Sequence, residues 1–158
     1  MSIKHNEKVR FQQITTPQRR QLMSRIKSCN TRPERKLRAL LRAAYPRHLK
    51  IKFNESALPG KPDAYIGAWK LAIFVDGCFF HFCPQHGHLP KSNSDYWSKK
   101  LIGNKRRDAR HSRTLRKLGF VVVRLWEHEL HSMDESALRR RIGRLLGRKK
   151  FLDRSSCH

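Results

Sequence analysis

The chain has 158 residues, which is long enough for one domain with its own hydrophobic core. Its 36 lysines and arginines outnumber its 12 acids and give a net charge of +24, so the expected partner is a polyanion, nucleic acid above all. No stretch approaches the length of an apolar transmembrane helix and no signal peptide opens the chain. We therefore expect a cytoplasmic protein without a membrane partner.

The first predicted helix follows a polar, basic segment without periodicity, which we interpret as an arm over residues 1–21. Thr31-Arg32-Pro33-Glu34 has the pattern of a capping box with an early proline, so a helix should begin there. Tyr45-Pro46 should end this helix. Its apolar face has helical spacing and consists of Leu37, Leu40, Leu41 and Ala44.

Three short strands should come next. Leu49–Phe53 is typical of an edge strand, and Lys70–Val75 is a short, partly β-branched apolar run that predicts a buried strand. Ala64–Ile66 should pair with that run as a hairpin, joined through Gly67-Ala68. The hairpin would place Asp63 at the mouth of one strand and Asp76 at the end of the next.

The C-terminal half predicts a long helix over residues 95–118 and then a strand at Phe120–Trp126 that is buried on both faces, as in a parallel or mixed sheet. Ser132 and Glu135 should cap a last helix. Its core face would hold Leu138, Ile142, Leu145 and Leu146, and its outward face Arg139, Arg140, Arg141, Arg144 and Arg148. The element order predicts an α/β fold with a small mixed sheet flanked by helices, a domain over residues 22–148 and a basic tail over residues 149–158.

Acidic residues at neighbouring strand ends are the first candidates for chemistry. Asp63 and Asp76 could together hold one hard cation for phosphodiester hydrolysis, with His81 just beyond them as a general base. The alternatives are a turn residue at Asp63 and a capped loop residue at Asp76. Glu34 is explained by the capping box alone, but it could also hold metal-bound water.

Cysteines and histidines gather after the central strand. In a reduced setting this favours metal over disulfides. Four N or S ligands complete a tetrahedral structural zinc site, and our candidates are Cys78, Cys83, His86 and His128. His88 is the spare ligand, and Cys29 and Cys157 are predicted bystanders. The alternative is two small buried cysteines with surface histidines.

Two further pairs have alternative readings. Asn104 and Asp108 interrupt the apolar stripe of the long helix, so they either form a satisfied hydrogen-bond network or face a groove and bind bases. Phe79 and Phe80 follow a glycine and a cysteine, so they either close the core or form a wedge that enters between base pairs.

Several stretches together resemble the very short patch repair (Vsr) DNA mismatch endonucleases. They are TRPERKLRALL, PGKPDAYI, FVDGCFFHFCPQHGHLPKSNSDYW and NKRRDARHSRTLRKLGFVVVRLWEHEL, in matching order over about Gln18–Leu146. The resemblance implies a restriction-endonuclease-like fold, a variant of the PD-(D/E)xK type. It also implies a bacterial, DNA-associated monomer that nicks one strand beside T:G mismatches left by deamination of 5-methylcytosine, with DNA repair proteins as candidate partners.

The resemblance also implies roles for individual residues. Asp63 and the backbone carbonyl of Val75 would bind magnesium, Glu34 would act through metal-bound water, and His81 would be the general acid or base. The wedge would consist of Met23, Phe79 and Phe80. Asn104 and Asp108 would recognise the T:G pair or support that recognition, and Cys78, Cys83, His86 and His128 would bind structural zinc. Asp76-Gly77-Cys78 lacks the lysine of the motif, so His81 would substitute for it and the role of Asp76 stays open.

Two other functions fit parts of the same sequence. A restriction-type endonuclease of this fold would cut matched duplex on both strands. A zinc-containing nucleic-acid-binding protein without catalysis would need the charge and the zinc ligands, but not Asp63 and His81.

Overall fold

The computed structural model describes residues 30–91 and 93–155, and it describes side chains as far as residue 147. The chain divides into two units after Asn30, and the unit from Thr31 onward contains the elements described. In chain order they are α2 (Arg32–Ala44), β1 (Ile51–Phe53), β2 (Ala64–Ile66), the 3-10 turn η1 (Gly67–Trp69), β3 (Leu71–Asp76), α3 (Ser94–Lys117), β4 (Val121–Trp126), α4 (Glu127–Ser132) and α5 (Glu135–Ser155). The arm, Met23, Cys29 and Cys157 lie outside the described residues, and the domain boundaries stay predictions.

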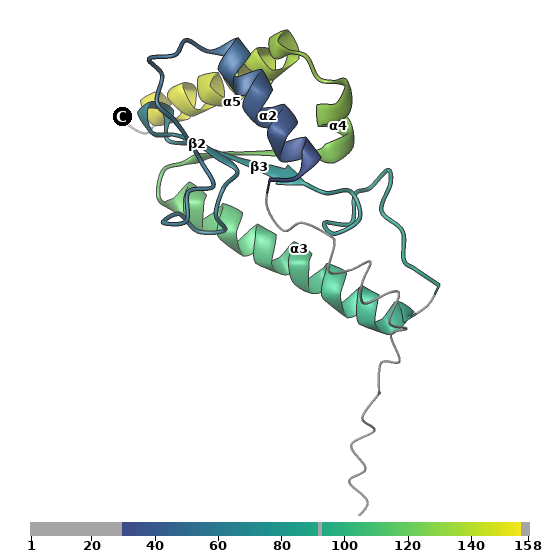
Figure 1. Cartoon of the computed structure of the whole chain (residues 1–158). Coiled ribbons are helices and arrows are strands. Elements are labelled where there is room, and N and C mark those ends of the chain that lie inside the picture. The colour runs from purple at the N-terminus through teal and green to yellow at the C-terminus, as the bar shows by residue number, and fades with distance from the viewer. Residues whose placement is uncertain (1–29, 92, 156–158) are drawn as a thin grey trace, which may run out of the picture. The chain divides into compact units, whose positions relative to one another are not determined.

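The four strands form one mixed sheet in the order β1-β2-β3-β4. β1, β2 and β3 pair antiparallel, whereas β3 pairs parallel with β4 from Leu71↔Val121 to Asp76↔Trp126. Figure 1 shows α2, α4 and α5 on one face of the sheet and α3 on the other. The predicted small mixed sheet flanked by helices is confirmed, and the crossover between the two parallel strands contains α3.

The central strand β3 is buried on both faces, and its side chains alternate between two cores. Leu71 and Ile73 pack into the core under α2, α4 and α5. Ala72 and Phe74 pack against Leu115 of α3 in a second, smaller core. Because side chains two residues apart share a face, Asp76 at the end of β3 belongs to the face that α3 covers.

The N-terminus of α2 has the capping arrangement that its sequence predicts. The Thr31 hydroxyl oxygen accepts a hydrogen bond from the Glu34 N–H at 3.4 Å, and the same hydroxyl donates to Glu34 Oε1 at 2.9 Å. Leu37 and Leu41 on the apolar face are fully buried. The helix is therefore fixed at its start by its cap and along its length by the core.

The segment after β4 differs from the prediction. It forms the short helix α4, in which Glu129 Oε2 accepts a hydrogen bond from the Trp126 N–H at 2.9 Å. Ser132 ends α4 and donates to the Glu129 carbonyl at 3.4 Å, so the predicted Ser132 cap of the last helix is wrong. Asp134 takes that place, because its Oδ1 accepts from the Ala137 N–H at 2.7 Å.

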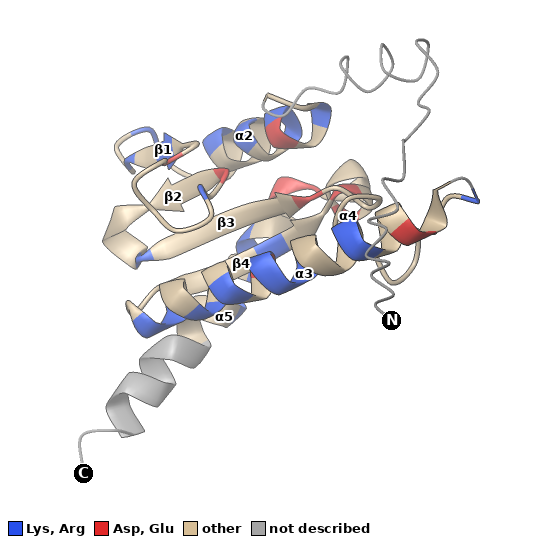
Figure 2. Ribbon diagram, turned by 90° about the horizontal axis from the view of Figure 1, so that it is seen from below, with Lys and Arg blue, Asp and Glu red and all other residues tan. Residues whose placement is uncertain are grey.

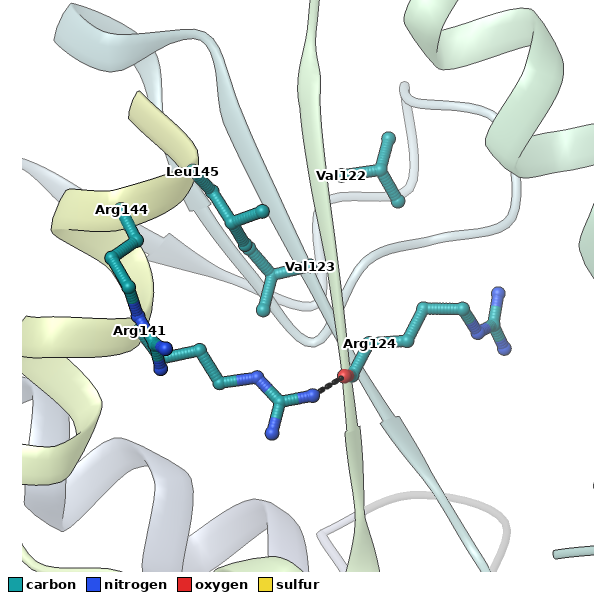
Figure 3. Close-up of a pocket in the computed structure, with 6 residues that line it drawn as sticks. All are labelled: Val122, Val123, Arg124, Arg141, Arg144 and Leu145. Carbon is teal, nitrogen blue, oxygen red and sulfur yellow. Dashed lines mark hydrogen bonds between the residues drawn. The ribbon is translucent and has the colours of Figure 1, made fainter. Parts of the chain in front are cut away.

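Arginine covers the outer edge of β4. Arg141 of α5 donates to the Arg124 carbonyl at 3.0 Å and to Glu129 Oε1 at 2.7 Å, so the prediction that Arg141 faces outward is wrong. This contact occupies part of an edge that would otherwise accept another strand. Beside it lies a pocket of about 300 Å³, lined by Val122, Val123, Arg124, Arg141, Arg144 and Leu145. In Figure 3 the Arg124 side chain leaves the strand on the side away from Arg141 and Arg144.

The described helices differ from membrane spans. None of them combines the length and the apolar composition that a bilayer crossing requires. Figure 2 instead shows lysine and arginine along the whole length of α3. The α3 helix thus carries many basic side chains and also packs against the sheet.

The smaller core can be tested by a matched pair of leucines. Leu115→Ala should lower the free energy of unfolding by about 2–5 kcal/mol, because Leu115 is fully buried. Leu118→Ala makes the same chemical change at a side chain that is 54% exposed, so its effect should stay below about 0.5 kcal/mol. Urea unfolding measures both, and equal losses would contradict the described core.

Candidate active site and metal centre

Two acids meet at one end of the β2–β3 hairpin. Asp63 immediately precedes β2 and Asp76 is the last residue of β3, and antiparallel pairing puts these two positions at the same end. Asp63 Oδ2 accepts a hydrogen bond from the Val75 N–H at 2.7 Å. The structure therefore brings the two acids together as the sequence predicts.

Asp63 lies in an environment that disfavours its charge. Burial raises the pKa of Asp63 to about 6; the Val75 hydrogen bond opposes this shift, while the carboxylates of Glu34 and Asp76 add to it. Glu34 belongs to the first turn of α2 and its side chain is buried. Three carboxyl groups, from α2, from the residue before β2 and from the end of β3, thus act on one another, which is an arrangement that a bound cation would stabilise.

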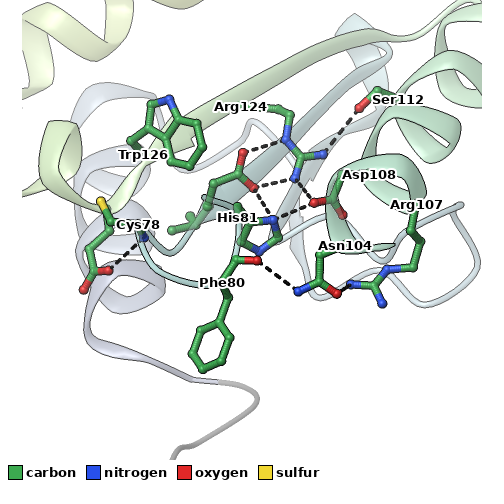
Figure 4. Close-up of polar contacts among 12 residues, drawn as sticks. Cys78, Phe80, His81, Asn104, Arg107, Asp108, Ser112, Arg124 and Trp126 are labelled. Atoms are coloured by element: carbon green, nitrogen blue, oxygen red, sulfur yellow. Dashed lines mark hydrogen bonds and ion pairs between the residues drawn. The ribbon is translucent and has the colours of Figure 1, made fainter. Parts of the chain in front are cut away.

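His81 faces carboxylates from two elements. Its Nδ1 lies 2.6 Å from Asp108 Oδ2 on α3 and 3.6 Å from Asp76 Oδ1 on β3. Figure 4 shows the His81 ring among the side chains of Asp108 and Arg124. The loop that carries His81 folds back on itself, because the His81 N–H donates to the Gly77 carbonyl at 3.1 Å. The result is a histidine–carboxylate pair that also faces Asp76.

Arg124 joins these acids from the middle of β4, and sequence reasoning missed it. Its Nε donates to Asp76 Oδ2 at 2.6 Å and its Nη2 bonds Asp76 Oδ1. The same Nη2 lies 3.5 Å from Asp108 Oδ2, and Nη1 lies 3.4 Å from Ser112 Oγ. The available signal was an arginine inside the apolar run FVVVRLW, since a charge in a buried strand requires a partner.

The charges in this group hold one another in the ionised state. Burial would lower the pKa of Arg124, but the hydrogen bond and charge of Asp76, together with the charges of Asp108 and Asp63, raise it. Burial would likewise raise the pKa of Asp108, but the hydrogen bond and charge of His81 and the charge of Arg124 lower it. Asp108 and Arg124 are therefore both charged near neutral pH.

Asn104 fixes the loop that carries His81. One turn before Asp108 on α3, its Nδ2 donates to the Phe80 carbonyl at 2.9 Å, and its Oδ1 accepts from Arg107 Nη2 at 3.0 Å. Both polar residues of the α3 stripe thus join a hydrogen-bond network, which is the first of the two readings that the sequence offers.

The predicted zinc ligands come together in space. The candidate ligand atoms of Cys78, Cys83, His86 and His128 all lie within 4.8 Å of one another. His128 Nδ1 is 3.2 Å from Cys78 Sγ and 3.6 Å from Cys83 Sγ, and His86 Nδ1 is 3.8 Å from Cys83 Sγ. Neighbouring ligands on a tetrahedral zinc ion are about 3.3–3.8 Å apart, so this donor set and its spacing fit a metal ion.

Local contacts shape this cluster. The α4 helix supplies His128 and also Glu127, whose Oε2 accepts from the Cys78 N–H at 3.4 Å. A Cβ at Gly87 would come within 2.5 Å of the Cys83 carbonyl oxygen, so only glycine permits the tight turn after His86. His88 lies outside the cluster, with its Nδ1 3.4 Å from the His86 carbonyl.

The aromatic pair belongs to a larger ring cluster. The Phe79 ring lies 5.1 Å from Phe80 and 5.0 Å from Trp97 of α3, as centroid distances. Both phenylalanines are half-buried. Figure 4 shows the Phe80 ring pointing away from Arg124 and Asp108.

Buried carboxylates that favour a cation, beside a histidine and a strongly basic helix, suit chemistry on a polyanion. The class of protein that combines these features on a small mixed sheet is that of the DNA endonucleases. The comparisons with known proteins identify the family within this class.

A family model described as DNA mismatch endonuclease Vsr matches residues 12–86. Type II nicking enzyme V.NmeAIP of Neisseria meningitidis serogroup A is 36% identical over 135 residues, covering 84% of this chain and 92% of the relative. Type II nicking enzyme V.XorIIP of Xanthomonas oryzae pv. oryzae is 38% identical over 135 residues, covering 84% and 95%. DNA mismatch endonuclease Vsr of Escherichia coli K12 is 30% identical over 118 residues, covering 72% and 71%. The chain belongs to the Vsr family.

Proposed function

We propose that this chain nicks one strand of duplex DNA beside T:G mismatches that arise from deamination of 5-methylcytosine. The observation that carries the proposal is that the half-buried Asp63 carboxyl shares its surroundings with Asp76, which in turn faces the His81–Asp108 pair, in a member of the Vsr family. The proposal includes a restriction-endonuclease-like fold, supported by the mixed four-stranded sheet and by the Pro62-Asp63 pair that precedes β2.

Asp63 is the proposed magnesium ligand, together with the Val75 carbonyl. Since the N–H and C=O of one strand residue point to the same side, the bond from the Val75 N–H to Asp63 supports a carbonyl directed the same way. Bound magnesium would offset the charge of the scissile phosphate and lower the pKa of bound water. Glu34 faces the same carboxyl from α2 and would hold that water.

His81 is the proposed general acid or base. Its Nδ1 is occupied by Asp108, which leaves Nε2 for the reacting group. Asp108, which was predicted to recognise the mismatch or to support its recognition, contacts His81, so we assign it to the orientation of this ring. Asn104 supports the same loop through the Phe80 carbonyl, and contact with the T:G pair stays part of the proposal.

Zinc is the ion that we propose for the Cys78, Cys83, His86 and His128 cluster. Four protein ligands leave no open position, so the ion would be structural. The cluster connects the loop after β3 with α4, two segments about 50 residues apart in sequence. Zinc would therefore stabilise the segment that carries His81.

The zinc assignment predicts a difference between two neighbouring histidines. Purified protein should contain about one zinc per chain by elemental analysis. His86→Gln should lower zinc content and the melting temperature, because it removes a ligand, and Cys78→Ser should impair folding for the same reason. His88→Gln is the matched control and should keep both values. A parent protein that is folded, active and free of zinc would contradict the assignment.

The magnesium assignment predicts that Asp63→Asn abolishes nicking while binding to mismatched duplex persists or strengthens. The amide keeps the shape but removes the anionic ligand and its repulsion of phosphate. His81→Ala should lower the single-turnover rate by about 10²–10⁴-fold with binding little changed. Asp95→Asn, at an exposed position in the first turn of α3, is the control.

The measurement uses T:G and matched duplexes of varied flanking sequence, with and without magnesium. Nicking of one strand only in the T:G duplex supports the proposal. Cleavage of both strands of matched duplex would favour a restriction-type endonuclease. Binding without cleavage would favour a nucleic-acid-binding protein without catalysis. Parental nicking by Asp63→Asn in magnesium would overturn the assignment of Asp63 as the magnesium ligand.

The wedge assignment predicts that Phe79→Ala and Phe80→Ala weaken binding to mismatched duplex, because stacking against an unstacked pair is lost. A fluorescent base analogue beside the mismatch should report less opening with both variants. The exposed Phe82 nearby provides Phe82→Ala as a comparison at a third ring of the same loop. If Phe79→Ala and Phe80→Ala behave like the parent, the two rings belong only to the aromatic cluster.

A further inference from the structure

We propose that Arg124 is a positioning residue that orients His81 by holding Asp76 and Asp108 against the same ring nitrogen. This inference rests on the proposed function, because it assigns His81 the proton transfer. Arg124 reaches the site from β4, whereas Asp76 belongs to β3 and Asp108 to α3. It therefore links three elements at one point.

The geometry that supports this role is a set of shared oxygen atoms. Arg124 Nη2 bonds Asp76 Oδ1 and lies 3.5 Å from Asp108 Oδ2. His81 Nδ1 lies 3.6 Å and 2.6 Å from these same two oxygens. One guanidinium nitrogen and one imidazole nitrogen thus face the same pair of acceptors.

This arrangement decides which nitrogen of His81 carries a proton. Ionised carboxylates only accept hydrogen bonds, so Nδ1 must be the donor. In the neutral ring Nε2 then carries the lone pair that can take a proton from a reacting group. Without Arg124, Asp76 and Asp108 would present two negative charges to one nitrogen with no cation between them, and their mutual repulsion would move them apart.

Arg124 is itself held in place on several sides. Its guanidinium carbon lies 5.0 Å from the centre of the Phe74 ring, and Nη1 is 3.4 Å from Ser112 Oγ. Its Nε and Nη2 take both oxygens of Asp76. A planar fork can make these contacts simultaneously, whereas a lysine ammonium at this position would keep the charge but lose the bidentate contact.

The inference also assigns Asp76, whose role the sequence left open. Both of its oxygens contact Arg124, and the residue is 3% exposed. Asp76 therefore acts on His81 together with Arg124, and Asp63 is the acid left for the magnesium ion.

The first test compares Arg124→Gln and Arg124→Lys with the parent in single-turnover nicking of T:G duplex and in equilibrium binding. Both variants should lower the nicking rate by about 10–100-fold, the range typical when a hydrogen-bond partner that orients a functional side chain is removed. The affinity for T:G duplex should change little. Arg141→Gln is the matched control, because Arg141 also bonds a carboxylate, that of Glu129, and meets β4 at the backbone carbonyl of Arg124 without touching the Arg124 side chain's carboxylate partners. A fall in affinity with an unchanged rate would overturn the proposal.

The second test adds Asp76→Asn and the Asp76→Asn, Arg124→Gln double variant. If Arg124 acts through Asp76, the double variant should nick no more slowly than the slower single variant. If the fold-losses in nicking rate of the two single variants multiply in the double variant, Arg124 acts directly on the DNA, and the positioning role is overturned.

A third measurement does not require activity. Long-range proton–nitrogen spectra of the histidine rings, with the His81 signals identified by their loss in His81→Gln, should show the proton on Nδ1 in the parent. Arg124→Gln should shift His81 toward the other tautomer, and Arg141→Gln should not. A parent that nicks no duplex would overturn the proposed function, while an unchanged His81 tautomer in Arg124→Gln would overturn this inference. If Arg124→Gln does not fold, the same spectra of Arg124→Lys test whether the His81 tautomer changes.

Discussion

The parallel pairing of β3 with β4 is the constraint on which the rest of the structure depends. It runs in step from Leu71↔Val121 to Asp76↔Trp126, and it is the only ladder that β4 makes among the described strands. Alternation of side chains along this ladder puts Arg124 on the same face as Phe74 and Asp76, under α3. The chain continues past both strand ends at the same edge, so the loop after β3 meets α4 there. The register of β3 against β4 therefore positions the residues of both the acid site and the metal cluster.

Much of the fold could be predicted because it depends on local patterns. The capping box at Thr31, the apolar stripe of α2 and the short turn between β2 and β3 each lie within a few residues, where spacing determines structure. The meeting of Asp63 and Asp76 follows from that hairpin alone. Cys78, Cys83 and His86 could be predicted as a group for the same reason, since all three come from one loop.

What could not be predicted concerns partners far apart in sequence. A pattern shows which face of its own element a residue occupies, but it does not show which residue lies opposite. Asp108 meets His81 across 27 positions and Arg124 meets Asp76 across 48, and neither pairing leaves a local trace. Arg141 looked solvent-exposed by periodicity, but the Glu129 carboxylate and the carbonyl of β4 bind it. The Ser132 cap failed because α4 takes up the residues before it.

The distance in sequence between the halves of each site has a consequence for synthesis of the protein. Cys78 and His128 are separated by 50 positions, and Asp76 and Arg124 by 48. When the ribosome has made the chain only as far as α3, Asp63, His81 and three of the four metal-binding side chains already exist. Neither the acid site nor the metal cluster can form yet, because Arg124 and His128 are missing. Both are completed only when β4 and α4 have emerged and paired with the earlier segments. Newly made chains therefore remain without a finished site until α4 has emerged, and any chain that terminates before α4 lacks both sites permanently.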